Sequence, residues 1–304
     1  MIDGIDHKDK INLGVIKVKE RKRVFLLMAL PAVVAFFIFH TLPLLKGISY
    51  SFTNWRGFGN FDFVGFKNYI SIFSDERIVN SYMFTIKFAV ISTIIVNVIS
   101  LTLAIGLNSK IKFKNTLRAI YFIPNILGGL IVGYIFSYIF TFVLTSFGQS
   151  IGSEVLSKSI LGNPNLAWLG VVVVASWQAI AFNTIIYISG LQTIPEDVYE
   201  ASSIDGANKW TQFKKITFPL IAPFFTINMV LAMKNFLNVF DQIISLTGGG
   251  PSGSTESIAI LIYKAGFEGS QFGYQSANSV IYFIVVVGIS LLQLKILERR
   301  EMEL

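Results

Sequence analysis

Six apolar stretches, each long enough to cross a bilayer as a helix, dominate this 304-residue sequence. The hydrocarbon core of a membrane is about 30 Å thick, a distance that a helix of roughly 20 residues spans. Each stretch has to be helical, because unsatisfied backbone groups in lipid cost several kcal/mol each. The sequence therefore predicts an all-α membrane protein with six transmembrane helices. We expect them at residues 24–46, 82–107, 118–143, 166–192, 219–246 and 276–297.

The composition fits this class and excludes several kinds of chemistry. Hydrophobic residues make up 53% of the chain and charged residues 14%, whereas a soluble domain carries about 25% charged residues. The absence of cysteine excludes disulfides, thiolate metal sites and cysteine catalysis. Two histidines are too few for a histidine metal cage. We therefore expect no catalytic and no metal-binding residues.

The basic residues predict the orientation of the spans. Most of the 25 Lys and Arg residues lie in both terminal segments and in the loops after the second and fourth spans: Lys8, Lys10, Lys17, Lys19, Arg21, Lys22, Arg23, Lys110, Lys112, Lys114, Arg118, Lys209, Lys214, Lys215, Lys295, Arg299 and Arg300. Cytoplasmic loops carry such an excess, so we expect both termini in the cytoplasm. The net charge of +7 then reflects topology, and we expect no nucleic-acid partner.

The chain reads as one membrane domain at 24–297 between cytoplasmic tails at 1–23 and 298–304. A cleaved signal peptide is the alternative for the first span. That span is longer than the roughly 7–15 residues of a signal core, and no small-x-small cleavage site follows it. We therefore expect the first span to be retained.

A polar insert at 193–218 separates the fourth and fifth spans. Pro195 suits the first turn of a helix, and acidic residues behind it favour the positive end of the helix dipole. Gly206 is placed to end that helix in a left-handed conformation, and a second short helix fits 208–217. The insert is either a docking module under the bilayer or an ordinary loop between helices.

The pattern in this insert resembles a known motif. Glu200-Ala201-x-x-x-Asp205-Gly206-Ala207, followed by Phe213, Ile216, Pro219 and Pro223, is similar to the EAA loop of the permease subunits of binding-protein-dependent ABC importers. Ser202 departs from the alanine that is usual at the third motif position. Two further stretches, "LRAIYFIP" at 117–124 and "FDQIISLTGGGPSGSTE" at 240–256, resemble the larger permease of carbohydrate importers of the maltose and glycerol-phosphate type.

The resemblance implies a function without catalysis in this chain. The first helix of the loop would dock into a cleft on a cytoplasmic ATPase through six residues: Glu200, Ala201, Ser202, Asp205, Gly206 and Ala207. No G-x-x-x-x-G-K-[ST] phosphate loop occurs, so ATP and Mg²⁺ would bind the partner subunits and this chain would hold no cofactor. Implied partners are a second homologous permease, two ATPase subunits, an extracellular or periplasmic binding protein, a carbohydrate and the lipid bilayer of a bacterial cell membrane. Oligosaccharide is the first choice of cargo, followed by glycerol phosphate or another polyol derivative.

Polar residues within the fourth and fifth spans predict a path for the cargo. Residues of this kind are costly in a membrane and mark functional sites by default. Aromatic rings beside them can pack on the C–H faces of a sugar. The candidates of both kinds are Gln178, Phe182, Asn183, Lys234, Asn235, Phe236, Asn238 and Asp241. Lys234, Asn238 and Asp241 follow helical spacing, which predicts one shared helix face. Asn235 and Gln242 border that face. The alternative is hydrogen bonding between helices; for Lys234 we favour an ion pair with Asp241 over contact with an anionic cargo.

Two other function classes fit less well. An ion-coupled transporter needs carboxylates deep in its helices, and Asp241 is the single acidic candidate. A membrane enzyme needs paired carboxylates, a histidine cluster or a nucleophile–base motif, and none occurs. The glycine-rich stretch at 247–255 is either a flexible connector or an outer loop that meets a substrate-carrying partner.

Overall fold

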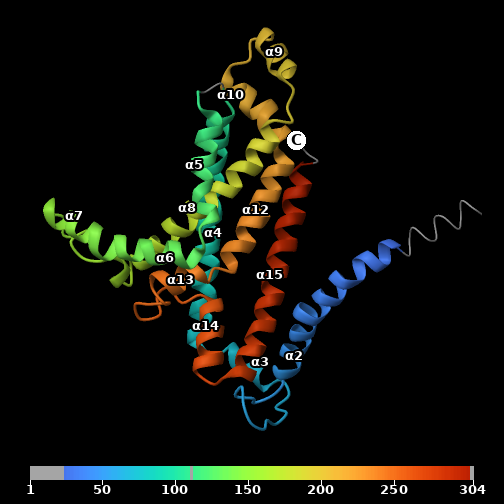
Figure 1. Ribbon diagram of the computed structural model, residues 1–304, viewed down its shortest axis with the longest axis vertical. Helices are drawn as coiled ribbons and strands as arrows, with labels where there is room; N and C mark the ends of the chain where they lie inside the picture. Colours follow the sequence, from blue (N-terminus) through green and yellow to red (C-terminus); the bar gives the residue numbers. More distant parts are fainter. Residues whose placement is uncertain (1–23, 110–111, 302–304) are drawn as a thin grey trace, which may run out of the picture.

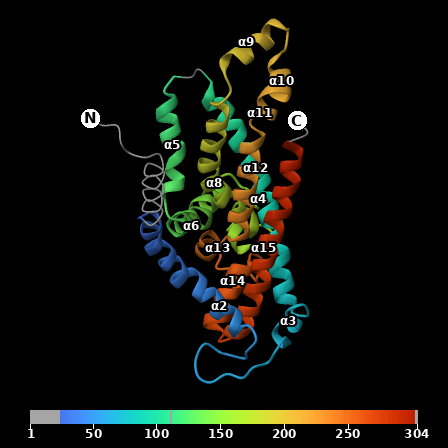
Figure 2. The ribbon, with the colours of Figure 1, turned by 90° about the vertical axis from the view of Figure 1, so that its right-hand side faces the viewer.

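The computed structural model describes residues 24–109 and 112–301 of the chain. Helices run between two ends of the molecule: the α9 end carries α9 and α10, and the α3 end carries α3 and the loop before it (Figures 1 and 2). The predicted tail at 1–23 lies outside the described residues, whereas residues 298–301 of the other predicted tail continue the last helix, α15.

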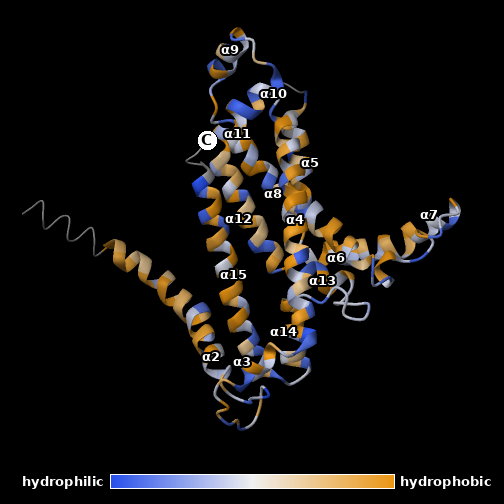
Figure 3. Ribbon diagram, turned by 180° about the vertical axis from the view of Figure 1, so that it is seen from behind, coloured by the Kyte–Doolittle hydropathy of each residue, from blue (hydrophilic) through white to orange (hydrophobic). Residues whose placement is uncertain are grey.

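Within the described residues, five helical segments are long and apolar enough to cross a membrane. They are Val24–Tyr50, α4 (Glu76–Asn108), Gly129–Ser150, α8 (Ala167–Leu191) and Phe272–Arg299, which lies within α15 (Phe272–Glu301). A sixth is counted if the bent pair Lys209–Leu220 and Ala222–Leu237, which meet at 68°, forms one span. Apolar residues occur along the whole length of these segments, while polar residues gather around α10 (Figure 3). The prediction of an all-α membrane protein is confirmed.

The first span diverges from the other helices. It includes a π-helical segment, η1 (Phe37–Thr41), and α2 (Leu42–Tyr50), and it meets α15 near the α3 end (Figure 1). A loop with α3 (Lys67–Ile72) and one isolated β-bridge between Thr53 and Phe63 joins it to α4.

The α4–α8 pair is the most extensive helix contact, and small or hydroxyl side chains make it possible. Ala89, Ser92, Ser100 and Ala104 of α4 are all buried. Ser100 donates a 3.2 Å hydrogen bond to the carbonyl of Ile180 in α8. Small residues let helix backbones approach closely in a membrane, where no hydrophobic force drives them together.

The predicted third span at 118–143 is broken into two helices. Helix α5 (Lys114–Ile126) ends before Leu127, which is extended, and α6 (Gly129–Tyr138) turns sideways (Figure 1). The turned arm continues through η2 (Ile139–Val143) and α7 (Leu144–Ser150), and a loop with η3 (Ile160–Gly162) leads back to α8. The prediction of one continuous helix was wrong because the backbone is extended at Leu127 and Gly128, and the Gly128–Gly129 pair interrupts the helix there.

The predicted fifth span at 219–246 is also broken. Helix α12 (Ala222–Leu237) ends half-way between the two ends of the molecule, and α13 (Asp241–Leu246) leaves in another direction (Figure 1). After the glycine-rich loop, α14 (Ile258–Tyr263) and η5 (Lys264–Glu268) continue to the α3 end. Helix α14 directly follows the glycine-rich stretch, and its residues Ile258, Ile260 and Leu261 are buried.

Side chains from elsewhere satisfy the backbone at this second break. Tyr282 of α15 donates a hydrogen bond to the carbonyl of Leu237. Ser257 donates to the carbonyl of Val239 at 3.1 Å. A break in a spanning helix is tolerated where neighbouring groups replace the lost hydrogen bonds.

Candidate coupling loop and substrate pathway

The polar insert forms a hairpin of short helices at the α9 end (Figure 2). Helix α9 (Glu196–Ile204) begins after Pro195 with two acidic residues in its first turn. Gly206 has a φ of +81°, a left-handed conformation that glycine adopts without strain. Helix α10 (Lys209–Gln212) follows, then η4 (Phe213–Thr217) and α11 (Phe218–Leu220). The predicted helix–glycine–helix order is confirmed.

Gln212 holds the two arms of the hairpin together. Its side-chain amide donates to the hydroxyl oxygen of Ser202 at 2.9 Å and to that of Ser203 at 3.0 Å. The hydroxyls of Tyr199 and Thr217 form a further hydrogen bond of 2.9 Å. These contacts join α9 to the segment that leads into α12. The sequence pattern gave no sign of the role of Gln212.

Most of the predicted coupling residues lie on the surface of this hairpin. Glu200, Ala201, Asp205 and Gly206 are exposed, and Ala207 is half-buried. Ser202 is buried instead and donates to the carbonyl of Tyr199 at 2.9 Å. Two large apolar side chains flank the motif with exposed fractions of 87% for Ile204 and 70% for Trp210.

The two broken spans meet at Gln178 of α8. Its amide nitrogen donates to the carbonyl oxygen of Leu127, at the break between α5 and α6, over 2.8 Å. Its amide oxygen accepts a 2.8 Å hydrogen bond from Gln242 of α13. The side chain of Gln178 thus links the break between α5 and α6 to α13, the helix that follows the break after α12.

A hollow of about 170 Å³ with both polar and apolar lining lies beside this link. It is lined by Asn125, Ala175, Gln178, Ala179, Asn235, Phe236, Val239 and Gln242. Three of the predicted pathway residues (Gln178, Asn235 and Phe236) meet there. The side-chain amides of Asn125 and Asn235 make no hydrogen bond within the described part of the chain. The hollow, named here the mid-span hollow, combines amides with an aromatic ring.

The other five predicted residues do not line the mid-span hollow. Phe182 is 41% exposed on α8. Asn183 is buried; its side chain donates to the carbonyl of Ala179, and its own carbonyl accepts from Asn228. Lys234 and Asn238 are exposed.

The predicted shared face of Lys234, Asn238 and Asp241 is wrong. Helix α12 ends at Leu237, Asn238 is its C-terminal cap, and Asp241 begins α13. The side-chain amide of Asn238 donates to the carbonyl of Lys234 at 2.8 Å. Among the described residues, no ion pair joins Lys234 to Asp241, because the break separates their helices.

Asp241 instead packs against the turned arm. Gly129 of α6 faces the side chain of Asp241, and Gly133 faces Ser245 one turn further along α13. A methyl group on Gly133 would come within 1.7 Å of the Ser245 hydroxyl. Gly129-x-x-x-Gly133 is the small-residue spacing found in closely packed helix pairs of membrane proteins. This spacing is a signal in the sequence that could have indicated the contact between α6 and α13.

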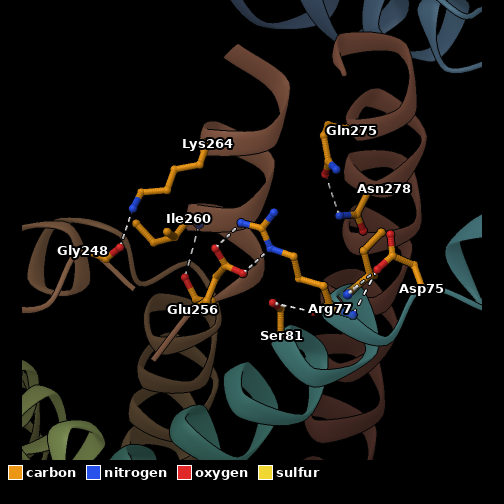
Figure 4. Close-up of polar contacts among 11 residues, drawn as sticks. Asp75, Arg77, Ser81, Gly248, Glu256, Ile260, Lys264, Gln275 and Asn278 are labelled. Atoms are coloured by element: carbon orange, nitrogen blue, oxygen red, sulfur yellow. Dashed lines mark hydrogen bonds and ion pairs between the residues drawn. The ribbon is translucent and has the colours of Figure 1, made fainter. Parts of the chain in front are cut away.

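A forked ion pair fixes the glycine-rich loop to α4 (Figure 4). Arg77 donates from Nε and Nη2 to the two carboxylate oxygens of Glu256, each over 2.8 Å. Lys264 donates to the carbonyl of Gly248 over 2.6 Å. These contacts disfavour the interpretation of the stretch as a flexible connector.

Comparison with known proteins decides the family. Residues 96–302 match the model of the "Binding-protein-dependent transport system inner membrane component". The chain belongs to this family. Its members are permease subunits without a nucleotide-binding site or catalysis of their own, so the resemblance drawn from the EAA loop is confirmed.

Individual relatives extend the match over nearly the whole chain. The chain is 38% identical to a probable starch degradation products transport system permease protein, AmyD, of Thermoanaerobacterium thermosulfurigenes, over 90% of this chain and 94% of that protein. It is 38% identical to the multiple sugar-binding transport system permease protein MsmF of Streptococcus mutans, over 91% of this chain and 95% of that protein. The fold matches a chain of a bacterial ABC transporter that imports the acidic polysaccharide alginate, with a TM-score of 0.80, 22% identity and coverage of 94% and 98%. This permease is thus a multi-pass membrane protein of a bacterial binding-protein-dependent transporter.

Proposed function

We propose that this permease forms half of the translocation pathway of an ATP-driven importer and that its cargo is an oligosaccharide. The cargo class is supported by relatives named for starch degradation products and for multiple sugars. Glucose oligomers are therefore the first cargo to test. Glycerol phosphate is the second candidate, because permeases named for it share 29–30% identity with this chain.

The observation that carries the coupling mechanism is the exposed and braced α9 hairpin. Glu200, Ala201 and Asp205 present a small polar surface that a cleft on another protein can enclose. Ile204 adds an apolar side chain that is 87% exposed in a segment outside the spans, and its burial against a partner would stabilise docking. The hydrogen bonds of Gln212 would transmit ATPase closure from α9 to α12.

The mid-span hollow is the proposed cargo site of this chain. Transporter sites commonly lie near the middle of the membrane at discontinuous helices, and both broken spans meet here. Asn125, Gln178, Asn235 and Gln242 offer amide groups that pair with sugar hydroxyls, and Phe236 offers a ring for a sugar C–H face. We include Phe182, Lys234, Asn238 and Asp241 as residues that approach cargo in another state of the transport cycle.

The remaining parts of the pathway come from partners. The exposed first span and the turned arm leave room for a second homologous permease, which would supply the other wall. Two ATPase subunits would dock at the α9 end in the cytoplasm, and a binding protein would deliver cargo at the α3 end. Both termini would then lie in the cytoplasm, as the lysines and arginines indicate.

Two experiments test this function. A panel of sugars and polyol phosphates titrated onto the cognate binding protein identifies the cargo. Proteoliposomes that contain the assembled transporter then report uptake with and without internal ATP. We expect oligosaccharide uptake that requires both ATP and the binding protein; uptake by this permease without an ATPase would contradict the proposal.

A further inference from the structure

A second hollow lies on the α3 side of the mid-span hollow. It measures about 490 Å³ and is lined by Met83, Phe84, Lys87, Phe88, Pro164, Asn165, Trp168 and Ser254. Three segments far apart in sequence form it: α4, the start of α8 and the glycine-rich loop. We name it the outer hollow.

Its chemistry centres on the ring of Trp168. The indole nitrogen donates to the carbonyl of Asn165 over 3.0 Å, which fixes the ring plane. The ammonium of Lys87 lies 4.8 Å from the ring centroid. A ring face that attracts a cation also attracts the partly positive C–H groups of a sugar, because both respond to the negative charge of the π face.

Ser254 adds an unused polar group to the same hollow. Its hydroxyl oxygen is buried and has no hydrogen-bond partner among the described residues. A buried polar group destabilises the protein when nothing pairs with it. A sugar hydroxyl in the outer hollow would satisfy it, and Lys87 and Asn165 line the same space with further polar groups.

A wall of two rings separates the two hollows. Phe88 lines the outer hollow and Phe236 lines the mid-span hollow. Their ring centroids lie 5.9 Å apart in an edge-to-face arrangement, and both side chains are buried. A chain of sugar units that occupied both hollows would pass this pair of rings.

We propose that the outer hollow is a second carbohydrate subsite, in which a sugar unit shares the Trp168 face with the Lys87 ammonium and hydrogen-bonds to Ser254. The inference rests on the proposed function and adds a site on the approach to the mid-span hollow. Cargo held in the mid-span hollow contacts a subsite in the outer hollow only if it is long enough to extend past the two rings. The outer hollow therefore favours longer oligosaccharides over short ones.

The test compares uptake of maltose and maltotetraose by proteoliposomes with the assembled transporter and its binding protein. For Trp168→Ala, we expect the ratio of maltotetraose to maltose uptake to fall about fivefold, which corresponds to roughly 1 kcal/mol of lost stacking. Trp168→Phe keeps a ring and should restore most of the ratio. Trp177→Ala, on the same helix but outside the hollow, should leave the ratio unchanged.

Ser254→Ala separates binding from folding. The change removes a hydroxyl that has no partner in the described part of the chain, so a purely structural role predicts no loss, whereas the subsite predicts a lower ratio. Equal effects of the Trp168 and Ser254 variants on both sugars, or no effect on either, would overturn the subsite and leave the proposed function intact. If the wild-type transporter takes up neither sugar, the proposed glucose-oligomer cargo fails, and the subsite fails with it.

Discussion

The side-chain amide of Gln178 donates a 2.8 Å hydrogen bond to the carbonyl oxygen of Leu127. That carbonyl lies at the break between α5 and α6, where no backbone amide of a continuous helix is available to it. The same side chain accepts from Gln242. Gln178 therefore stabilises the broken geometry that shapes the mid-span hollow.

Replacement of Gln178 by alanine should destabilise this arrangement. It leaves the Leu127 carbonyl and the Gln242 amide without their partner, and we expect a loss of about 1 kcal/mol in unfolding free energy, as for interhelical hydrogen bonds in membranes. Thermal melting of the detergent-purified permease measures the change. Gln192→Ala is the matched control, because Gln192 is exposed at the end of α8; equal melting temperatures for the two variants would refute the role of Gln178.

The contact between α6 and α13 should be intolerant of a single methyl group. In Gly133→Ala the new Cβ would lie 1.7 Å from the Ser245 hydroxyl, so we expect a cost of about 1–3 kcal/mol from overpacking. Gly288→Ala on α15 meets no atom within 4 Å and should be neutral or stabilise the helix by up to about 1 kcal/mol. The yield and melting temperature of the two purified variants are the readouts. Similar values for both would show that α6 and α13 do not pack as described.

The ion pair between Arg77 and Glu256 should show strong coupling in a double-mutant cycle. The side chain of Glu256 is 10% exposed and that of Arg77 is 58% exposed. We expect Arg77→Ala to cost about 2 kcal/mol, between the values for surface and buried pairs, because it leaves a buried carboxylate unpaired. Adding Glu256→Gln should restore part of the loss. Additive effects on the unfolding free energy would mean that the pair contributes nothing specific.

Loosening the α9 hairpin should weaken force transmission without removing the docking surface. Gln212→Ala deletes the hydrogen bonds to Ser202 and Ser203 while Glu200 and Asp205 stay exposed. We expect the ATPase subunits to copurify with this variant while uptake per ATP hydrolysed falls at least about threefold, the effect of roughly 0.7 kcal/mol. Unchanged uptake per ATP would show that the Gln212 bridge is not part of the coupling path.

The sequence predicted the structure correctly where that structure depends on residues close together in the chain. Pro195, the acidic first turn and Gly206 place the two short helices of the insert correctly, because caps and turns depend on neighbouring residues. The length of each apolar stretch likewise indicated membrane helices, since bilayer thickness fixes that length.

The breaks in the third and fifth spans depend on distant partners. Between Leu237 and Asp241 the sequence contains no glycine or proline, so helical spacing continues through the break without a signal. Tyr282 and Ser257 replace the lost hydrogen bonds there, and neither is close in sequence to Leu237. The mid-span hollow was therefore only partly predictable: Gln178, Asn235 and Gln242 were found from polarity and Phe236 as an aromatic ring beside them, whereas Asn125 required the fold.

In the proposed mechanism, α9 transmits the work of a partner ATPase to the membrane helices. The most direct measurement compares ATP-driven oligosaccharide uptake by proteoliposomes with wild-type, Glu200→Lys and Glu196→Lys permease in the assembled transporter. Both glutamates are exposed on α9, so the two variants make the same change of charge one turn apart. We expect at least about a tenfold loss for Glu200→Lys, the effect of about 1.4 kcal/mol, and near wild-type uptake for Glu196→Lys. Wild-type uptake by the Glu200→Lys transporter would contradict it.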